Sequence, residues 1–215
     1  MANLKKTETT VQGRQPLIVA TRESKETKIQ VELGLFPGAS SIGTGIGFLD
    51  HLLTSLACHA GWTLRLECKG DREVDDHHSA EDCAITLGIA LREALIDKGA
   101  IQRFGTAFAP MDEALSRAVV DISGRPFCDT SLQLERETIG ELAAENIAHF
   151  FQSFAMNAGI TVHVDILKGS NDHHKAEAAF KALALALREA LAPALSPAAA
   201  STKGATVISV SRKTE

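Results

Sequence analysis

"DHHSAEDCAITLGIALREAL", residues 76–95, returns later in the chain as "DHHKAEAAFKALALALREAL", residues 172–191, with 12 identical residues in 20. The segments that precede the two copies also match, because "HLLTSLACHAGWTLRL" at 51–66 aligns with "HFFQSFAMNAGITVHV" at 149–164. Two copies are too few for a solenoid. The repeat therefore predicts two similar halves that pack around a pseudo-twofold axis.

Each half is expected to contain the same order of elements. Helical spacing of apolar residues, together with glycine or proline stop signals, predicts helices at 48–60, 79–97, 141–158 and 175–192. Alternating, β-rich segments predict strands at 16–24, 27–33, 62–68, 115–124, 127–135 and 160–167. The sum is an α+β fold with two small sheets, each backed by two helices. Because the helices are apolar mainly on one face, we expect one helix layer to pack against the other.

The composition fits one globular domain made of two closely packed halves. The chain has 215 residues, 45% of them hydrophobic, and a net charge of −5. The slightly acidic charge and the 5% aromatic content argue against nucleic-acid binding. Apolar runs such as 182–187 are too short to cross a membrane, and the first 16 residues contain no secretory signal. Four cysteines without a Cys-x-x-Cys pattern predict reduced, mostly buried thiols in a cytoplasmic protein.

The repeated His-His-x-x-Glu motif contains residue types that bind metal ions. Glu81 follows His77 by four residues and His78 by three, so it can share a helical face with either histidine. Adjacent helical residues point about 100° apart, so the paired histidines more naturally serve two separate ions. The same spacing recurs in His173, His174 and Glu177.

Two further histidines complete a symmetric set. His51 and His149 occupy matching positions on the preceding helices, which gives six imidazoles and two carboxylates. Shared between two ions, this set supplies three His and one Glu to each and leaves room for substrate or water. Imidazole and carboxylate without thiolate suit Mn, Fe, Co or Zn. Such an ion keeps a net positive charge and acts as a Lewis acid.

A single His-His pair is more often a surface or capping feature than a pair of ligands. Helix packing gives no reason to keep His-His-x-x-Glu twice at equivalent points of a duplication, so we expect ligation here. His59 and His163 have no counterpart in the other half, and from the sequence pattern alone they are expected to be surface or hydrogen-bonded histidines.

Four long motifs contain most of these residues. They are "GFLDHLLTSLACHAGW" at 47–62, "DDHHSAEDCAITLG" at 75–88, "RFGTAFAPMDEALSRAVVDISGRP" at 103–126 and "NDHHKAEAAFKALALALREA" at 171–190. In their order and their residues they resemble the imidazoleglycerol-phosphate dehydratase family of histidine biosynthesis, and the residues are most similar to the fungal type. The resemblance runs from about Val19 to Gly204.

The resemblance has implications for the whole molecule. It implies a fold of the ribosomal S5 domain 2-like type: an internal duplication of two halves, each of one β-sheet and two helices, with helix layers packed between two small sheets. A single catalytic domain would span residues 1–204, with halves at about 16–100 and 101–194, followed by a tail at 205–215. The family also implies a small-molecule phosphate substrate, two manganese ions per active site, and a homo-oligomer of 24 subunits with sites shared between them.

The family's functional residues transfer to matching positions of this chain. The implied metal ligands are His51, His77, His78, Glu81, His149, His173, His174 and Glu177. The implied substrate-site residues are Glu26, His59, Arg103, Arg125, Lys181, Ser201 and Lys203. The arginines, Ser201 and Lys203 are implied phosphate contacts. Some family members have Gln where this chain has Ser55, which puts one substrate contact in doubt.

The implied reaction, a carbon–oxygen lyase step, agrees with the residues. Imidazole glycerol phosphate would lose water to give imidazole acetol phosphate, although no carbonyl acidifies the carbon that loses its proton. Metal on the ring nitrogens would stabilise an imidazolate, which can expel the hydroxide. Glu26 or Glu177 would act as the acid or base. Arginine suits the phosphate because its planar fork binds two oxygens.

Two other functions compete with this one. A dinuclear metallohydrolase would use a bridging hydroxide, and a metal-storage or metal-sensing shell would need no reaction at all. The phosphate-type residues Arg103, Arg125 and Lys203 argue against storage. Formation of the ketone product would separate a lyase from a hydrolase.

Overall fold

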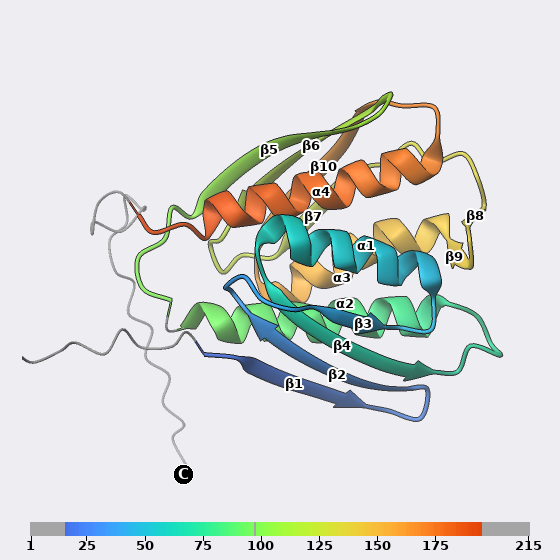
Figure 1. Ribbon diagram of the computed structural model, residues 1–215, viewed down its shortest axis with the longest axis horizontal. Coiled ribbons are helices and arrows are strands. Elements are labelled where there is room, and N and C mark those ends of the chain that lie inside the picture. Colours follow the sequence, from blue (N-terminus) through green and yellow to red (C-terminus); the bar gives the residue numbers. More distant parts are fainter. Residues whose placement is uncertain (1–15, 97, 195–215) are drawn as a thin grey trace, which may run out of the picture.

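The computed structural model describes residues 16–96 and 98–194. Four helices fill the space between two four-stranded sheets, so the molecule has four layers (Figure 1). The first half consists of β1 (Ile18–Glu23), β2 (Thr27–Gly34), β3 (Ser41–Gly43), α1 (Gly47–Ala60), β4 (Thr63–Gly70) and α2 (His77–Ile96). The second half consists of β5 (Phe104–Met111), β6 (Ala114–Asp121), β7 (Phe127–Ser131), the short β8 (Thr138–Ile139) and β9 (Leu142–Ala143), α3 (Ala144–Ala158), β10 (Thr161–Lys168) and α4 (Asp172–Ala190).

The two sheets have the same topology. The strand order is β1-β2-β4-β3 in the first sheet and β5-β6-β10-β7 in the second. In each sheet three strands are antiparallel, and the third strand of that half pairs in parallel at the edge. Thr63 pairs with Gly34 and its counterpart Thr161 pairs with Asp121, so the registers also correspond. The predicted fold class, an internal duplication with helices between two small sheets, is confirmed.

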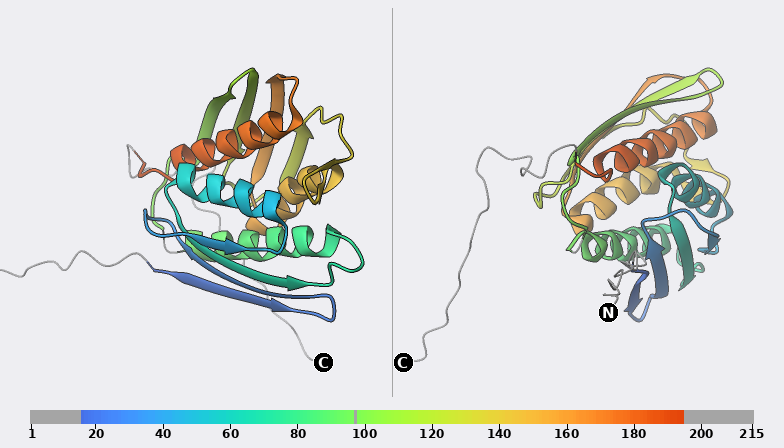
Figure 2. Two further views of the ribbon diagram at one scale, coloured as in Figure 1. Left: turned by 45° about the vertical axis from the view of Figure 1, so that its right-hand side comes forward. Right: turned by 60° about the vertical axis from the view of Figure 1, so that its left-hand side comes forward.

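The helices of the two halves pair crosswise. Helix α2 packs on α3, and α1 packs on α4, so each pair joins the first half to the second. All four helices start at the same end of the bundle, on the right in Figure 1, and Figure 2 shows them between the sheets from two further sides. Four buried phenylalanines fill the centre of the second half: Phe150, Phe151, Phe154 and Phe180.

Gly88 explains why α2 and α3 approach each other so closely. A Cβ atom at this position would lie 2.7 Å from the carbonyl oxygen of Phe154 on α3. The backbones therefore meet without an intervening side chain. This close approach fixes how far α2 and α3 are shifted along their axes relative to each other, and so which residues lie side by side near their N-termini.

The sequence patterns missed one strand in each four-stranded sheet, β3 and β5, as well as the two-residue strands β8 and β9. Strand β5 contains Gly105 and Pro110, which are poor strand residues. It forms because a strand at the edge of a sheet tolerates proline. It also forms because Gly105 lies against α4, where a Cβ atom would clash with the Ala186 carbonyl. Strand β3 has only three residues and no alternation to detect. The helix predicted from residue 141 begins at Ala144, because residues 142–143 pair in β9 instead.

The cysteines are free thiols, as expected, although they differ in exposure. Cys68 and Cys83 are buried, Cys128 is half-buried and Cys58 is exposed. No helix within residues 16–96 and 98–194 is long and apolar enough to cross a membrane.

Candidate metal centre

One group of possible ligands lies between the first turns of α1 and α4; we call it the α1/α4 cluster. It consists of His51, His173 and Glu177. The Glu177 carboxylate lies 3.1 Å from Nε2 of His51 and 3.4 Å from Nε2 of His173. The ring of Phe48 packs 4.8 Å from the ring of His173 and forms an apolar wall on one side.

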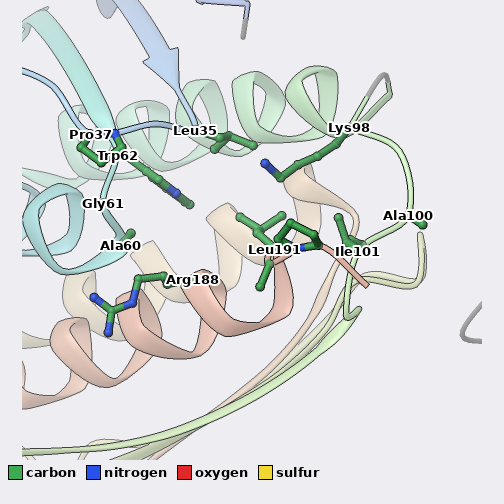
Figure 3. Close-up of a pocket in the computed structure, with 12 residues that line it drawn as sticks. Leu35, Pro37, Ala60, Gly61, Trp62, Lys98, Ala100, Ile101, Arg188 and Leu191 are labelled. Carbon is green, nitrogen blue, oxygen red and sulfur yellow. The ribbon is translucent and has the colours of Figure 1, made fainter. Parts of the chain in front are cut away.

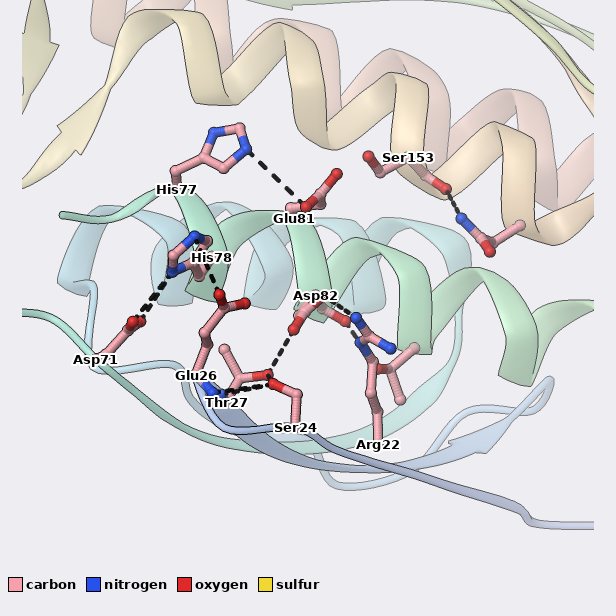
Figure 4. A network of polar contacts seen from close by, with 12 residues as sticks. Arg22, Ser24, Glu26, Thr27, Asp71, His77, His78, Glu81, Asp82 and Ser153 are labelled. Carbon is pink, nitrogen blue, oxygen red and sulfur yellow. Dashed lines mark hydrogen bonds and ion pairs between the residues drawn. The ribbon is translucent and has the colours of Figure 1, made fainter. Parts of the chain in front are cut away.

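A second group, the α2/α3 cluster, has the same composition and consists of His77, Glu81 and His149. The Glu81 carboxylate lies 2.9 Å from Nε2 of His149 and 3.9 Å from Nε2 of His77, whose rings stack at 4.9 Å. Figure 4 shows His77 and Glu81 facing each other on α2. In both clusters the donor atoms lie within 4.8 Å of one another, close to the roughly 3–4 Å between ligands of one ion at normal bond lengths.

Each cluster joins the two halves of the duplication. The His-x-x-x-Glu pair comes from the last helix of one half, and the single histidine comes from the first helix of the other half. Side chains four residues apart share a helical face, which brings His173 to Glu177 and His77 to Glu81. The crosswise pairing of the helices then supplies His51 and His149. The duplication therefore makes two equivalent clusters only because the halves are packed together.

Short polar residues place the His pairs in the first helical turn. The Asn171 side chain caps α4 by accepting hydrogen bonds from the backbone N–H groups of His173 (2.9 Å) and His174 (3.4 Å). Asp75 accepts a bond from the N–H of His77 at 2.8 Å. The next residue, Asp76, accepts a bond from the N–H of Ala143, directly ahead of α3. This last contact ties the start of α2 to the start of α3, the two helices that carry the α2/α3 cluster.

The second histidine of each pair points away from both clusters. Nδ1 of His78 lies 3.1 Å from the Asp71 carboxylate, and its Nε2 lies 3.9 Å from Glu26 (Figure 4). Nδ1 of His174 lies 2.7 Å from Glu113. The pKa of both histidines is raised, chiefly by these hydrogen-bonded carboxylates. Within one chain each cluster thus contains two His and one Glu. The third histidine that the sequence analysis assigned to each ion, His78 or His174, faces a carboxylate on a loop; we call these two the outward-facing histidines because they face away from the clusters.

Electrostatics keep Glu177 ionised. Burial raises its pKa, but hydrogen bonds from Lys181 and His51 outweigh that effect and lower the pKa to about 2. Lys181 Nζ lies 2.7 Å from the Glu177 carboxylate, so this predicted substrate residue adjoins the α1/α4 cluster. His59 lies farther along α1, where burial and the positive charges of Lys181 and Arg188 lower its pKa and favour the neutral imidazole.

The predicted phosphate arginines lie at the other end of the bundle. Arg103 donates a backbone bond to the carbonyl of Ala190 at the end of α4, and α4 runs about 20 Å from Glu177 to this point at 1.5 Å per residue. Arg103 and Arg125 both meet the carboxylate of Asp121, at 2.7 and 3.5 Å. One chain therefore brings the two arginines together but keeps them away from its own clusters. Ser201 and Lys203 lie outside the described residues.

A hollow of about 380 Å³ opens near the same end of the bundle (Figure 3). Trp62, Leu191 and the side chains of Lys98 and Arg188 line part of it. None of the predicted site residues in the described part of the chain contributes to its wall. The candidate metal ligands therefore lie near the helix N-termini rather than in this cavity.

The sequence reasoning missed the partners of the histidine Nδ1 atoms. These are Asp71, Glu113 and Asn146, which lies 2.8 Å from Nδ1 of His77. Asp71 and Asn146 belong to no repeated motif, so no pattern marks them. For Glu113 a signal was present, because it immediately precedes β6 as Glu26 immediately precedes β2. The oxygen partners on Nδ1 leave Nε2 as the ligating atom, as is usual for histidines that bind metals.

Comparisons with known proteins point to one family. The family model described as imidazoleglycerol-phosphate dehydratase matches residues 44–187. The chain is similar to the imidazoleglycerol-phosphate dehydratase of Candida glabrata, with 52% identity over 85% of this chain and 96% of the relative. Crystal structures of the enzymes from Staphylococcus aureus and Pyrococcus furiosus share its fold. Their TM-scores are 0.75 and 0.76 at 38% identity, over 82% and 86% of this chain and 100% and 99% of theirs.

Proposed function

The chain belongs to the imidazoleglycerol-phosphate dehydratase family, and we propose that its two His/Glu clusters and its two outward-facing histidines hold a pair of divalent metal ions that serve this activity. The activity itself is a hydro-lyase step of histidine biosynthesis, in which imidazole glycerol phosphate loses water to give imidazole acetol phosphate. The single observation that carries the proposal is the pair of equivalent clusters, each with two Nε2 atoms directed at one carboxylate.

The donor set fits a metal such as manganese. Histidine nitrogen and carboxylate oxygen without thiolate suit divalent Mn, Fe, Co or Zn, and we propose Mn²⁺ with two ions per active site. When bound, the ions supply Lewis acidity, which lowers the free energy of negative charge developing on the substrate's imidazole ring. The ionised Glu177, with its pKa held at about 2, is a ready anionic ligand.

Proton transfer is assigned to Glu26. The reaction must remove a proton from one carbon and deliver a proton to the hydroxyl that leaves the next carbon. Glu177 is already engaged by His51, His173 and Lys181, which makes it a ligand rather than a free base. Glu26 is exposed in the β1–β2 turn, and its carboxylate lies 3.9 Å from Nε2 of His78. It is therefore the better placed carboxylate to exchange a proton with substrate.

Substrate binding is assigned to residues of both ends of the bundle. Arg103 and Arg125 would bind the phosphate dianion in place of Asp121, helped by Ser201 and Lys203. His59 and Lys181, near the α1/α4 cluster, would contact the rest of the substrate. A small substrate cannot bridge the roughly 20 Å from cluster to arginines within one chain.

We therefore propose a homo-oligomer with shared sites and, from the family resemblance, 24 subunits. A neighbouring copy would bring its arginines to the clusters and would add the outward-facing His78 and His174 to ions on other chains. Symmetric closure of such contacts gives a defined shell rather than an open filament. We place the single catalytic domain at residues 1–204, with the halves meeting near residue 100, and a tail at 205–215. The free thiols agree with a cytoplasmic location.

A direct assay tests the activity. Purified protein supplied with Mn²⁺ should convert imidazole glycerol phosphate to imidazole acetol phosphate, detected by the ultraviolet absorbance of the enolised product. Protein treated with a chelator is the control and should recover activity when Mn²⁺ is restored. Release of inorganic phosphate without ketone formation would instead indicate a hydrolase and would overturn the proposal.

A further inference from the structure

Each of the two outward-facing histidines has a carboxylate beside its Nδ1 atom, and the duplication does not explain this. Nδ1 of His78 is held by Asp71, with both carboxylate oxygens within 3.2 Å, and Nδ1 of His174 is held by Glu113 at 2.7 Å. The two histidines occupy equivalent positions of the repeat. If their partners were merely inherited, the partners would also be equivalent.

They are not equivalent. Asp71 follows Lys69 and Gly70 at the end of β4. The residue that follows the matching Lys168 and Gly169 at the end of β10 is Ser170, which has no carboxylate. Glu113 immediately precedes β6, and the residue that immediately precedes the matching strand β2 is Glu26. Glu26 lies on the Nε2 side of His78, at 3.9 Å, rather than on its Nδ1 side.

A glycine lets the turn pass close to the following helix in both halves, because a Cβ atom at Gly70 would clash with Ser79 and one at Gly169 would lie 2.9 Å from Cγ of the matching residue Lys175. The glycines therefore do not distinguish the two halves, and other contacts hold Glu113 beside His174. Glu113 also accepts hydrogen bonds from the backbone N–H groups of Ser170 (3.2 Å) and Asn171 (2.8 Å), which fixes its carboxylate.

Each half thus supplies a carboxylate to the same histidine nitrogen from a different element. A recurrence built from non-equivalent residues points to a functional requirement rather than to common descent of the contact. We propose that Asp71 and Glu113 are positioning residues: each fixes the ring of its histidine so that Nε2 faces away from the helix bundle, toward a metal ion. This inference rests on the proposed function of His78 and His174 as ligands.

The chemistry of such a contact is general. A carboxylate that accepts the Nδ1–H bond sets the tautomer and the orientation of the ring, and it makes the other nitrogen a better metal donor. Removal of such a partner weakens metal binding by about 10–100-fold. His77, inside a cluster, has only the neutral amide of Asn146 on Nδ1. The carboxylates are found on the outward-facing histidines, which have no cluster around them to hold the ring.

The test is a Mn²⁺ titration of Asp71→Asn and Glu113→Gln, followed by the electron paramagnetic resonance signal of free Mn²⁺. Asp71 is the cleaner site, because its side chain contacts only His78 among the hydrogen bonds and ion pairs of the described residues. We expect about 10–100-fold weaker binding of one ion for each variant, and recovery in Asp71→Glu. Unfolding of the metal-free Asp71→Asn protein should match that of the wild type.

Asp129→Asn is the matched control. Asp129 lies 3.8 Å from Nδ1 of His163, which belongs to neither cluster, so its loss should leave Mn²⁺ binding unchanged. Wild-type binding by Asp71→Asn and Glu113→Gln, with weakened binding in His78→Ala and His174→Ala, would overturn the positioning role while the ligand assignment stands. Unchanged binding in His78→Ala and His174→Ala would overturn the ligand assignment itself. If metal-free Asp71→Asn protein unfolds more easily than the wild type and Asp71→Glu does not restore Mn²⁺ binding, then the contact stabilises the fold and does not position a ligand.

Discussion

At the scale of single residues, the two adjacent histidines of each His-His-x-x-Glu motif point in different directions and contact different carboxylates. His77 and His173 face inward to Glu81 and Glu177, whereas His78 and His174 face outward to carboxylates on loops. The 100° between neighbouring helical positions is enough to separate the two directions. One short motif can therefore serve two ions, one at the cluster between paired helices and one on the side of the loop carboxylates.

The first prediction concerns the inward-facing histidines. His77→Ala should remove one donor from the α2/α3 cluster, and His173→Ala should remove one from the α1/α4 cluster. Each variant should lose about one ion per chain, because each ion would lose one of its four proposed protein ligands. Elemental analysis of the purified proteins measures this. His163→Ala, which changes a histidine outside both clusters, should keep full metal content. Unchanged metal content in both cluster variants would show that the ligands are wrongly assigned.

The second prediction concerns acid stability. The pKa of Glu177 is lowered in the folded chain to about 2, from an ordinary value of 4.5. Its ion pairs therefore stabilise the metal-free protein fully above pH 4.5, and this contribution is lost as the pH falls toward 2. Glu177→Gln should remove a contribution on the order of 2 kcal/mol near neutral pH, and it should flatten the dependence of the unfolding free energy on pH between about 4.5 and 2. Denaturant unfolding of metal-free protein at several pH values measures this, and parallel curves for the two proteins would contradict it.

At the scale of elements, close packing of α2 on α3 sets the geometry of one cluster. Gly88 allows the backbones to touch, and the α2/α3 cluster lies on the same two helices nearer their N-termini. The counterpart of Gly88 in the second half is Ala184, so the α1/α4 pair has no equivalent glycine contact. The two clusters are alike in composition but are held by different packing.

This difference gives a third prediction. Gly88→Ala should force α2 and α3 apart, because its Cβ would lie 2.7 Å from the carbonyl oxygen of Phe154. We expect a loss of about 1–3 kcal/mol in the free energy of unfolding and weaker binding of the ion in the α2/α3 cluster, with the other ion unaffected. Thermal unfolding and Mn²⁺ titration measure both effects. Gly47→Ala, where a Cβ meets nothing within 4 Å, should leave both unchanged. Equal weakening of both ions in Gly88→Ala would contradict the prediction.

The elements also show what could be predicted from the sequence. All four helices and the central strands follow from periodicity and from the internal repeat, because these signals are local. Strand β5 could not be predicted, since its glycine and proline are tolerated only through contacts with α4 and an edge position. The pairing of His51 with His173 and of His77 with His149 also depends on crosswise helix packing, which no local pattern contains.

At the scale of the whole molecule, the candidate metal ligands and the two arginines lie at opposite ends of the helix bundle. The sequence places Arg103 and Arg125 in family motifs but contains no information on their distance from the histidines. In the fold, Arg103 contacts the end of α4, about 20 Å from Glu177. The separation is the physical reason to expect several copies at each active site.

A fourth prediction tests the arginines. Arg125→Ala should weaken substrate binding by about 1.5–3 kcal/mol, the contribution of a hydrogen bond to a charged group, and should leave metal content unchanged. Steady-state kinetics should show the effect mainly as a raised Michaelis constant. Arg117→Ala is the control, because Arg117 is also exposed and paired with a carboxylate, Asp165, but belongs to no predicted site. An unchanged Michaelis constant in Arg125→Ala would remove that residue from the phosphate site.

The central claim is that metal clusters and phosphate arginines from different copies of the chain meet in one active site. Co-expression of His173→Ala and Arg125→Ala copies tests it most directly, because each variant alone should have little activity at substrate concentrations well below the wild-type Michaelis constant. A site is intact when its metal clusters come from an Arg125→Ala copy and its arginine comes from a His173→Ala copy. Random mixing of equal amounts should therefore give intact sites at up to about a quarter of the positions. Dehydratase activity of the mixed oligomer well above the sum of the two pure variants is the predicted result. Activity equal to that sum, in oligomers shown by mass to contain both variants, would contradict the account.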